Sequence, residues 1–396
     1  MEQNKIELNR KHIGLRIAAF VIVLGVAATF ISIGIVSLVS KKSGVHLISS
    51  EYDNNYECGF YLEGKSKEIA QSEERIKSNY TAIMKKNFSL LSNENKDESY
   101  FGISYLNKHL NEDIKIDKYA YDILLEAYNY SKTYGNYSIF ASPIYEIWNE
   151  LFNFKKTGLD YINNDPVNNN KKQELLSEIS SSIFDTNKIN IEFKEDNVIR
   201  VNVSEEYLSL LKDNDLDKST ISLNILYDSY ASDKLYDSFK EEKYSKCYFK
   251  TSDSLFVIDY DDISLNVTNS KLDSFGTLKF NKDEEKKISM YRLFNTLSND
   301  ISSFYYIEKE GQGFNRTKFI NISDGYPVNE IKQNIIVDDK NKSMVELSLI
   351  NNELLVSNKD YDIIKMFSSS DNEINISKQL ENVFVKANKN YQYNFF

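Results

Sequence analysis

The side chains that come closest to a chemical site in this sequence lie in FINISDGYPVNE, residues 319–330. Apolar residues lead into the segment and an apolar run, 335–337, follows it, so the pattern predicts a strand, a turn and a second strand. Gly325 can take a positive φ in the turn, and Pro327 fixes its exit. Asp324 adds a carboxylate, an oxygen ligand for a hard metal ion. A plain connection between strands explains the same residues, so the turn alone establishes no function.

The usual nucleophiles and metal ligands are scarce elsewhere in the chain. The histidines are His12, His46 and His109, and only His109 belongs to the predicted folded body, where its neighbours, NKHLNED, are typical of a surface segment. Cys58 and Cys247 lack the spacing of a metal site. They could form one disulfide, but buried thiols are the simpler prediction. The sequence therefore gives little support to histidine catalysis or to a cysteine metal centre.

The composition is that of a folded, acidic protein. The chain has 396 residues, 41% of them hydrophobic, which is enough for a sizeable core. Its net charge is −11, and Lys is interspersed with Asp and Glu without a basic stripe, which argues against nucleic-acid binding. Glycine accounts for only 13 of the 396 residues, whereas about 7% of the residues in an average protein are glycine. This scarcity argues against glycine-rich phosphate loops, although a general drift toward Asn, Lys, Ile and Tyr would deplete glycine as well.

An apolar segment near the N-terminus predicts a membrane anchor. Residues 17–39, IAAFVIVLGVAATFISIGIVSLV, carry no charge, and a helix over them would be about 35 Å long, enough to cross a hydrocarbon core of about 30 Å. The run is too long for a secretory signal, so we expect an uncleaved anchor. More basic residues precede the run than follow it closely, which favours a cytoplasmic N-terminus. They are Lys5, Arg10, Lys11 and Arg16 on one side and Lys41 and Lys42 on the other. We therefore expect a single-pass protein of the cell membrane with an extracytoplasmic body.

The rest of the chain predicts a mixed α+β body. We expect a cytoplasmic tail over 1–16, the anchor over 17–39, an exposed connector over 40–66 with a short strand, and one domain over 67–396. Helices are predicted over 66–88, 117–134, 155–188 and 230–244. Short strands are predicted over 189–193, 198–203, 219–226, 247–249, 255–260, 263–267 and 277–280.

The order of several segments resembles the FAD:protein FMN transferase (ApbE) family. The helix DKYAYDILLEAYNYSKTYG runs directly into NYSIFASPIYEIWNEL, as the family's helix runs into a segment that ends in Trp. LLSNENKDESYFGISYLNK precedes them, and SLNILYDSYASDKL, FINISDGYPVNE and KSMVELSLINNELL follow, each where the family has a corresponding motif. The order is kept from about residue 67 to residue 356, which is most of the predicted body.

This resemblance implies both a fold and an activity. It implies an ApbE-like fold of mixed sheets and helices, an FAD bound outside the cytoplasm with Mg²⁺ on its pyrophosphate, and transfer of FMN to a threonine of a target protein. Such chemistry needs backbone amides near phosphates, an oxygen-ligand metal site, and positive or metal charge at the developing phosphoryl anion.

In the turn, this chain keeps the family's frame but changes the side chains. The family's histidine, aspartate and threonine positions are occupied by Lys318, Asn321 and Asp324, which are the catalytic-motif positions implied by the resemblance. Gly325 and Tyr326 belong to the shared frame and are candidates for cofactor binding on the same ground.

The motifs before the turn also carry different residues. Ser138 stands at the family's aspartate, and Asp228 stands at a lysine, where a carboxylate would repel a pyrophosphate. Tyr230 matches the family, and with Ser138 and Asp228 it completes the cofactor-binding candidates.

The metal positions implied by the resemblance carry Tyr227, Val345 and Leu349, which we predict do not bind Mg²⁺. Glu346 and Ser348, beside Val345, would supply oxygen ligands only if the alignment is shifted.

These substitutions favour a catalytically impaired protein, a pseudoenzyme that acts in binding or as an accessory. An active, Mg²⁺-dependent FAD:protein FMN transferase with a shifted site is one alternative, and an exported surface or scaffold protein unrelated to flavin is another. FAD and Mg²⁺ are expected as cofactors only if the family activity persists. The family context and the anchor suggest the membrane and a flavoprotein or membrane redox complex as partners.

Overall fold

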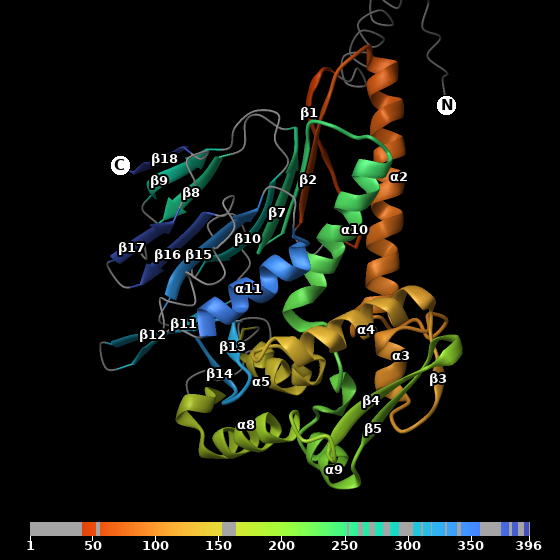
Figure 1. The fold of residues 1–396 in the computed structure, drawn as a ribbon, viewed down its shortest axis with the longest axis vertical. Helices are drawn as coiled ribbons and strands as arrows, with labels where there is room; N and C mark the ends of the chain where they lie inside the picture. The colour runs from red at the N-terminus through yellow and green to blue at the C-terminus, as the bar shows by residue number, and fades with distance from the viewer. Residues whose placement is uncertain are drawn as a thin grey trace, which may run out of the picture. The chain divides into compact units, whose positions relative to one another are not determined.

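The computed structural model describes residues 42–52, 56–152, 164–251, 253–259, 264–268, 274–279, 286–292, 304–309, 312–317, 319–328, 331–338, 342–356, 374–379, 382–386 and 392–395 (Figure 1). The chain divides into two compact units, one made of Met1–Val45 and Leu62–Arg75 and the other of His46–Tyr61 and Ile76–Phe396. The predicted tail over 1–16 and the predicted anchor over 17–39 lie outside the described residues. Within the described part, no helix is both long and apolar enough to cross a membrane.

The main sheet has eight strands in the order β1-β2-β6-β7-β10-β15-β16-β17. They are β1 (Gly44–Ile48), β2 (Glu57–Leu62), β6 (Cys247–Lys250), β7 (Ser254–Ile258), β10 (Lys286–Arg292), β15 (Ile331–Asp338), β16 (Ile374–Gln379) and β17 (Asn382–Lys386). From β2 to β17 every neighbouring pair is antiparallel. Every residue of β7 is buried, so the sheet is covered on both faces at this strand.

Two of these strands come from residues 40–66, which we expected to be an exposed connector with one short strand around residues 46–48. That strand is part of β1, whereas β2 was not expected. Cys58 and Phe60 on β2 are each 1% exposed, and burial of such side chains fixes the segment in the sheet. Cys58 and Cys247 are both buried, and neither is in a disulfide. The register pairs Cys58 with Phe249 and Cys247 with Phe60, so the two cysteines are not opposite each other.

Two helices pack on the sheet, α10 (Tyr227–Glu241) and α11 (Met344–Val356), and a longer one, α2 (Ser66–Leu91), precedes them in the chain. α10 packs against β7, and α11 packs against β10 and β15. The two helices also contact each other, so their interface lies beside the middle of the sheet.

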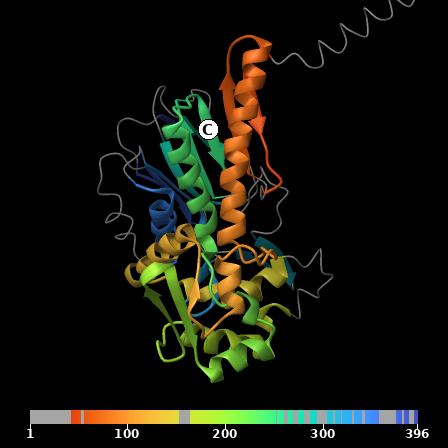
Figure 2. The same ribbon diagram turned by 90° about the vertical axis from the view of Figure 1, so that its right-hand side faces the viewer.

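The elements between residues 100 and 226, coloured orange to green, gather at one end of the larger unit (Figure 1, Figure 2). The helical ones are α3 (Ile103–Lys108), α4 (Lys118–Thr133), η1 (Ile139–Ala141), α5 (Ser142–Phe152), η2 (Pro166–Asn168), α8 (Asn170–Ser182), η3 (Glu195–Asn197), α9 (Glu205–Asp213), η4 (Asp217–Ser219) and η5 (Asn224–Leu226). They enclose an apolar core in which Trp148 of α5 is fully buried. Asp117 caps α4 as predicted, since its carboxylate accepts a bond from the N–H of Tyr119 at 2.7 Å.

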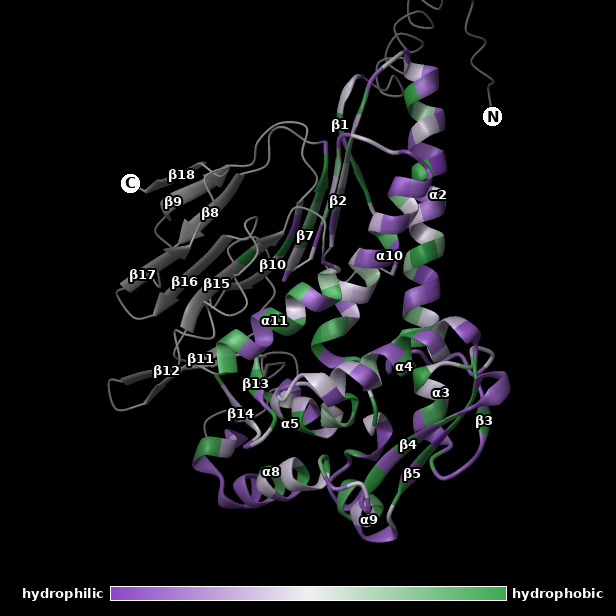
Figure 3. Ribbon diagram, in the orientation of Figure 1, coloured by the Kyte–Doolittle hydropathy of each residue, from purple (hydrophilic) through white to green (hydrophobic). Residues whose placement is uncertain are grey.

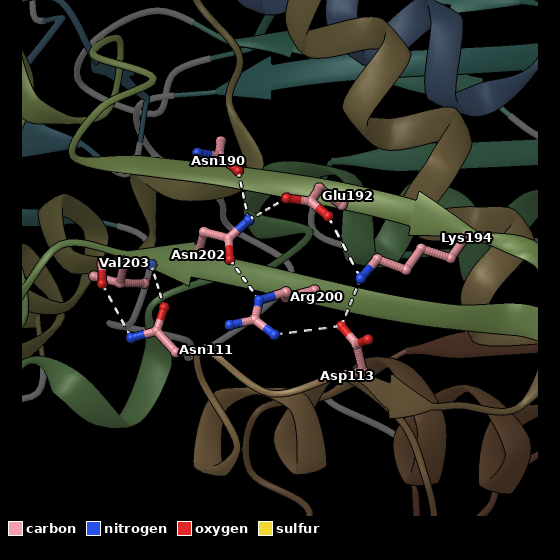
Figure 4. Close-up of polar contacts among 8 residues, drawn as sticks. All are labelled: Asn111, Asp113, Asn190, Glu192, Lys194, Arg200, Asn202 and Val203. Carbon is pink, nitrogen blue, oxygen red and sulfur yellow. Dashed lines mark hydrogen bonds and ion pairs between the residues drawn. The ribbon is translucent and has the colours of Figure 1, made fainter.

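A small sheet closes this end, in the order β3-β5-β4. Its strands are β3 (Ile114–Lys115), β4 (Ile189–Lys194) and β5 (Val198–Val203). Polar residues alternate with apolar ones along both longer strands, INIEFK and VIRVNV (Figure 3), and the isoleucines of β4 are buried. The polar face is linked by its own side chains (Figure 4): Lys194 Nζ lies 2.7 Å from Asp113 Oδ1, and Asn202 donates to Glu192 at 2.7 Å. The hydrogen bond from Lys194 is the main reason that the pKa of the Asp113 carboxyl is lowered.

The remaining strands form separate small sheets. β11 (Phe304–Lys309) pairs with β12 (Gln312–Thr317), and β13 (Ile320–Asn321) pairs with β14 (Tyr326–Pro327). β8 (Ser264–Thr268), β9 (Ser274–Lys279) and β18 (Gln392–Phe395) form a three-stranded sheet in the order β18-β9-β8. The predicted α+β class is confirmed. The strand predicted over 219–226 is wrong: η4 ends at Ser219, η5 covers Asn224–Leu226, and Asn224 has a φ of 51°, which does not fit an extended strand.

Candidate functional site

The turn between β13 and β14 has the predicted form of strand, turn and strand. Ile320 pairs with Pro327 and Asn321 with Tyr326. Gly325 has a φ of 79°, and its N–H donates to the carbonyl of Asn321 at 2.8 Å. The glycine thus supplies the left-handed conformation that closes the turn.

The polar side chains of the turn bind to the turn itself. Asn321 Nδ2 donates to Asp324 Oδ2 at 2.9 Å, and Asp324 Oδ1 accepts the N–H of Tyr326 at 2.9 Å. Asn321 Oδ1 accepts both the N–H and the hydroxyl of Ser323, at 3.1 and 2.7 Å. The structure therefore brings the catalytic-motif candidates Asn321 and Asp324 together, and their hydrogen bonds stabilise the turn. Lys318, the third candidate, lies outside the described residues.

Trp148 fastens the turn to the helical core. Its indole Nε1 donates to the carbonyl of Gly325 at 2.7 Å, and its ring meets that of Tyr326 edge to face with centroids 6.3 Å apart. A Cβ at position 325 would lie 3.0 Å from Ser180 Oγ and 3.2 Å from Leu176. Glycine is therefore favoured here by φ, and a methyl group would also press against these two side chains. Tyr326 is partly exposed and packs on this tryptophan.

Asn136 joins the turn to α11 and was not predicted as a site residue. Its side chain donates to the carbonyl of Ile320 at 3.1 Å and accepts the N–H of Ile322 at 2.9 Å. Its own N–H donates to Glu353 Oε1 at 2.6 Å, and its carbonyl accepts Asn352 Nδ2 at 2.8 Å. Burial raises the pKa of the Glu353 carboxyl, although the bond from Asn136 opposes the shift. Nothing in the sequence marks this residue apart from its place after a predicted helix end at Gly135.

Ser138 and Asn224 hold two motifs together through the backbone. Ser138 Oγ accepts the N–H of Phe140 at 3.1 Å, which caps η1, and its carbonyl accepts Asn224 Nδ2 at 3.0 Å. Asn224 has a φ of 51°, a left-handed conformation that asparagine adopts more readily than most residues. The predicted cofactor role of Ser138 stays a prediction, while its hydroxyl here serves a cap.

The start of α10 carries the next candidates, Tyr227, Asp228 and Tyr230. Asp228 Oδ1 accepts a short hydrogen bond from the hydroxyl of Tyr56. Burial, followed by the charge of Asp228, raises the pKa of Tyr227. Tyr230 is only 2% exposed and belongs to the apolar core, so its ring packs inside the protein and offers no open face for stacking.

The implied metal positions on α11 face the protein interior. Val345 and Leu349 are 2% and 0% exposed and lie in the apolar core. Ser348 Oγ lies 2.6 Å from Ser229 Oγ of α10, in a buried contact. Glu346 forms a capping box with Ser343: each side chain binds the other residue's N–H, at 2.9 and 3.0 Å.

Asp233 of α10 holds the first turn of α11. Its carboxylate accepts the N–H of Met344 at 2.7 Å and that of Val345 at 3.1 Å. Lys287 Nζ lies 3.9 Å from Asp233 Oδ1 and 4.2 Å from the centre of the Tyr236 ring. Burial raises the pKa of Asp233 to about 6, against the lowering effect of the two backbone bonds.

Buried hydroxyls continue from this interface to the end of β6. Ser254 Oγ lies 3.0 Å from Ser232 Oγ and 2.7 Å from Thr251 Oγ1. Ser232 donates to the carbonyl of Asp228 at 2.9 Å. These buried hydroxyls therefore satisfy one another within the protein.

The side chains at the motif positions do not fit an Mg²⁺ site of the implied kind. Val345 and Leu349 have no ligating atom, and the oxygens of Glu346, Ser348 and Asp228 are bonded within the protein. Among the described residues, no three His, Cys, Asp or Glu side chains are grouped so that they could hold a metal ion. His109 lies at the surface, with Nδ1 3.4 Å from Glu112 and its ring stacked on Tyr105.

The fold itself is similar to that of ApbE flavin transferases of known structure. The ApbE protein of Thermotoga maritima superposes with a TM-score of 0.58, at 12% identity, over 88% of this chain and 97% of that chain. The flavin transferase ApbE of Vibrio cholerae gives a TM-score of 0.57 at 11% identity over 88% and 98% of the two chains. The apo flavinyl transferase ApbE of Pseudomonas stutzeri gives 0.56 at 11% identity over 88% and 95%. No protein-family model and no curated protein matches the sequence. The ApbE-like fold expected from the ordered motifs is confirmed.

Proposed function

We propose that this chain is a membrane-anchored, extracytoplasmic binding or accessory protein built on the flavin-transferase fold, without that fold's Mg²⁺ and FAD chemistry. The observation that carries the proposal is the interface between α10 and α11. There, Val345 and Leu349 are buried in the apolar core, and Ser348 is bonded to Ser229 at 2.6 Å. A metal ion at this place would have to displace packed side chains, and the described residues include no group of three His, Cys, Asp or Glu side chains that could bind it.

The charge at the start of α10 supports the same proposal. Asp228 replaces the lysine implied by the resemblance, and it is engaged with Tyr56. A carboxylate facing a pyrophosphate would repel it, whereas the family chemistry needs positive charge there. Phosphoryl transfer on this chain would therefore lack both its metal ligands and its cationic partner.

The membrane location rests on the uncharged run over residues 17–39 and on the basic residues before it. An anchor of this kind would hold the body beside other membrane proteins. A flavoprotein or a membrane redox complex is the partner we propose, because flavin transferases act on such proteins. Purification of the full chain from native membranes after mild cross-linking tests this proposal. Recovery of flavoproteins or redox subunits supports it, and their absence contradicts it.

A transfer assay tests the loss of activity. The full chain is incubated with FAD, Mg²⁺ and a threonine-containing target protein, and flavin fluorescence on the target is measured after denaturing electrophoresis. The flavin transferase ApbE of Vibrio cholerae serves as the positive control. We expect labelling by the control and none by this chain, and Mg²⁺-dependent labelling by this chain would contradict the proposal.

The assay also separates the alternatives. An active transferase with a shifted site would label the target, with Glu346, Ser348 or Asp324 as the ligands to mutate next. A scaffold with no relation to flavin transferases is disfavoured, because the fold covers 88% of the chain at a TM-score of 0.58.

A further inference from the structure

Strand β1 exposes apolar side chains at the edge of the main sheet. It is the outermost strand, beside β2. Leu47 is 64% exposed, the most of any large hydrophobic side chain in the described part, and Val45 is 49% exposed, whereas Ile48 is 4% exposed. Alternate residues of a strand point to the same side, so Val45 and Leu47 share the open side of β1.

Nothing in the sequence of β1 protects this edge. Its residues, GVHLI, include no Lys, Arg, Asp, Glu or Pro. Soluble proteins usually guard an edge strand with charges, proline or a covering element, because an open apolar edge promotes aggregation. Tyr61 on the neighbouring strand β2 is also 37% exposed. We therefore expect another surface to cover the exposed apolar side chains of this strand.

The length of the link to the apolar run identifies that partner. Residues 40–43 connect the end of the run to β1 and, at about 3.5 Å each, can reach about 14 Å at most. The headgroup layer outside the hydrocarbon core is about 5–8 Å thick. In a protein anchored by residues 17–39, β1 therefore begins within about 10 Å of the headgroups.

We infer that β1 lies in the membrane interface, with Val45 and Leu47 against the lipid surface. This inference rests on the anchor of the proposed function and adds to it a contact made by the folded body. Each molecule would meet the bilayer through this strand whether or not it has a protein partner, and apolar side chains at the headgroup boundary are stabilised there. The contact would fix how the body is held above the membrane.

Tryptophan fluorescence of the full chain tests the inference. The only native tryptophan, Trp148, is fully buried and provides a constant background. Leu47→Trp places a probe on β1, and Phe184→Trp places a matched probe at another exposed hydrophobic, 52% exposed, on a different segment. Both variants are reconstituted in vesicles of phosphatidylcholine with a minority of phosphatidylglycerol, with and without bromine on the acyl chains. Flotation of the wild-type chain with the same vesicles is measured separately.

We expect the probe at position 47 to emit at shorter wavelength in vesicles and to lose emission with brominated lipid, while the probe at 184 changes little. A chain that floats with vesicles but whose probe at 47 is unquenched would overturn the inference and leave the anchor intact. A blue-shifted but unquenched probe at 47 would mean that a second copy or another protein covers β1. Equal quenching at 184 would mean that the contact is not specific to β1. Either result would overturn the inference. Failure of the wild-type chain to float would overturn the anchor and this inference together.

Discussion

At the scale of single residues, the turn has the form that the resemblance implied, and its polar side chains form hydrogen bonds within the turn itself. Asn321 and Asp324 bond to each other and to the turn backbone, and Gly325 presents its carbonyl to Trp148 at 2.7 Å. Gly325 and Trp148, which fix the conformation, are residues that match in the resemblance. The positions to which the resemblance assigns chemistry carry other residues here.

The turn gives a direct test at Gly325. Gly325→Ala must adopt a φ of 79° and bring its methyl group to 3.0 Å from Ser180 Oγ. A non-glycine residue in such a conformation costs about 1–3 kcal/mol, so we expect the free energy of unfolding to fall by that amount. Urea denaturation measures it.

Gly135→Ala is the matched control, because no neighbouring atom lies within 4 Å of its added methyl group and its φ is not positive. We expect this variant to stay within about 1 kcal/mol of the wild type or to be slightly more stable. Equal effects of the two substitutions would show that the turn does not constrain position 325.

At the scale of elements, α10 and α11 form one interface that combines polar and apolar contacts. Ser229 meets Ser348, Asp233 caps the first turn of α11, and Val345 and Leu349 fill the core. At its other end, α11 holds Asn136 through Asn352 and Glu353. The helix is thus fastened to α10 at one end and to the turn at the other.

The contact between Ser229 and Ser348 predicts a coupling in a double-mutant cycle. Each single Ser→Ala substitution leaves the other hydroxyl buried without its partner, which costs about 1–3 kcal/mol. Removing both should cost less than the sum by about 0.5–1.5 kcal/mol, and denaturant unfolding of the four proteins measures this difference. Additive effects would mean that the two hydroxyls do not interact.

Asp233 predicts a pH dependence of stability. Its pKa rises from 3.8 to about 6 on folding, so between these values the folded protein binds more protons than the unfolded chain. The contribution of Asp233 to the free energy of unfolding is fully present below pH 3.8 and is lost as the pH rises through about 6. The shift in pKa corresponds to about 3 kcal/mol of this free energy. The free energy of unfolding of the wild type, minus that of Asp233→Asn, should fall by about this amount from pH 4 to pH 7.

Asp213→Asn provides the control for this prediction, because Asp213 is exposed on α9 and is not among the groups that shift the pKa of Asp233. We expect this variant to keep the pH dependence of the wild type. A difference curve for Asp233→Asn that is flat, or that rises with pH, would contradict the assigned cause.

At the scale of the whole molecule, local sequence patterns predicted the turns, caps and helices well, whereas the contacts between distant residues could not be predicted from them. The turn at Gly325, the cap at Asp117 and the helix expected over 230–244, which the structure has as α10 over Tyr227–Glu241, follow from neighbouring residues, and the fold follows from the order of motifs. The bonds that decide the site join residues far apart: 184 positions separate Asn136 from Ile320, and 119 separate Ser229 from Ser348. No periodicity encodes such pairs. The segment over 219–226 has the composition of a strand, but Asn107 binds both the N–H and the carbonyl of Ile221 and holds it out of any sheet.

The account depends most on the claim that this fold binds no Mg²⁺–FAD in this chain. Calorimetric titration of the full chain in detergent with FAD, in the presence and absence of Mg²⁺, tests it directly, with the Vibrio cholerae transferase as the positive control. We predict no binding in either condition. Micromolar binding that strengthens with Mg²⁺ would contradict the account, because it would require ligands where Val345 and Leu349 are buried and tolerance of a pyrophosphate beside Asp228.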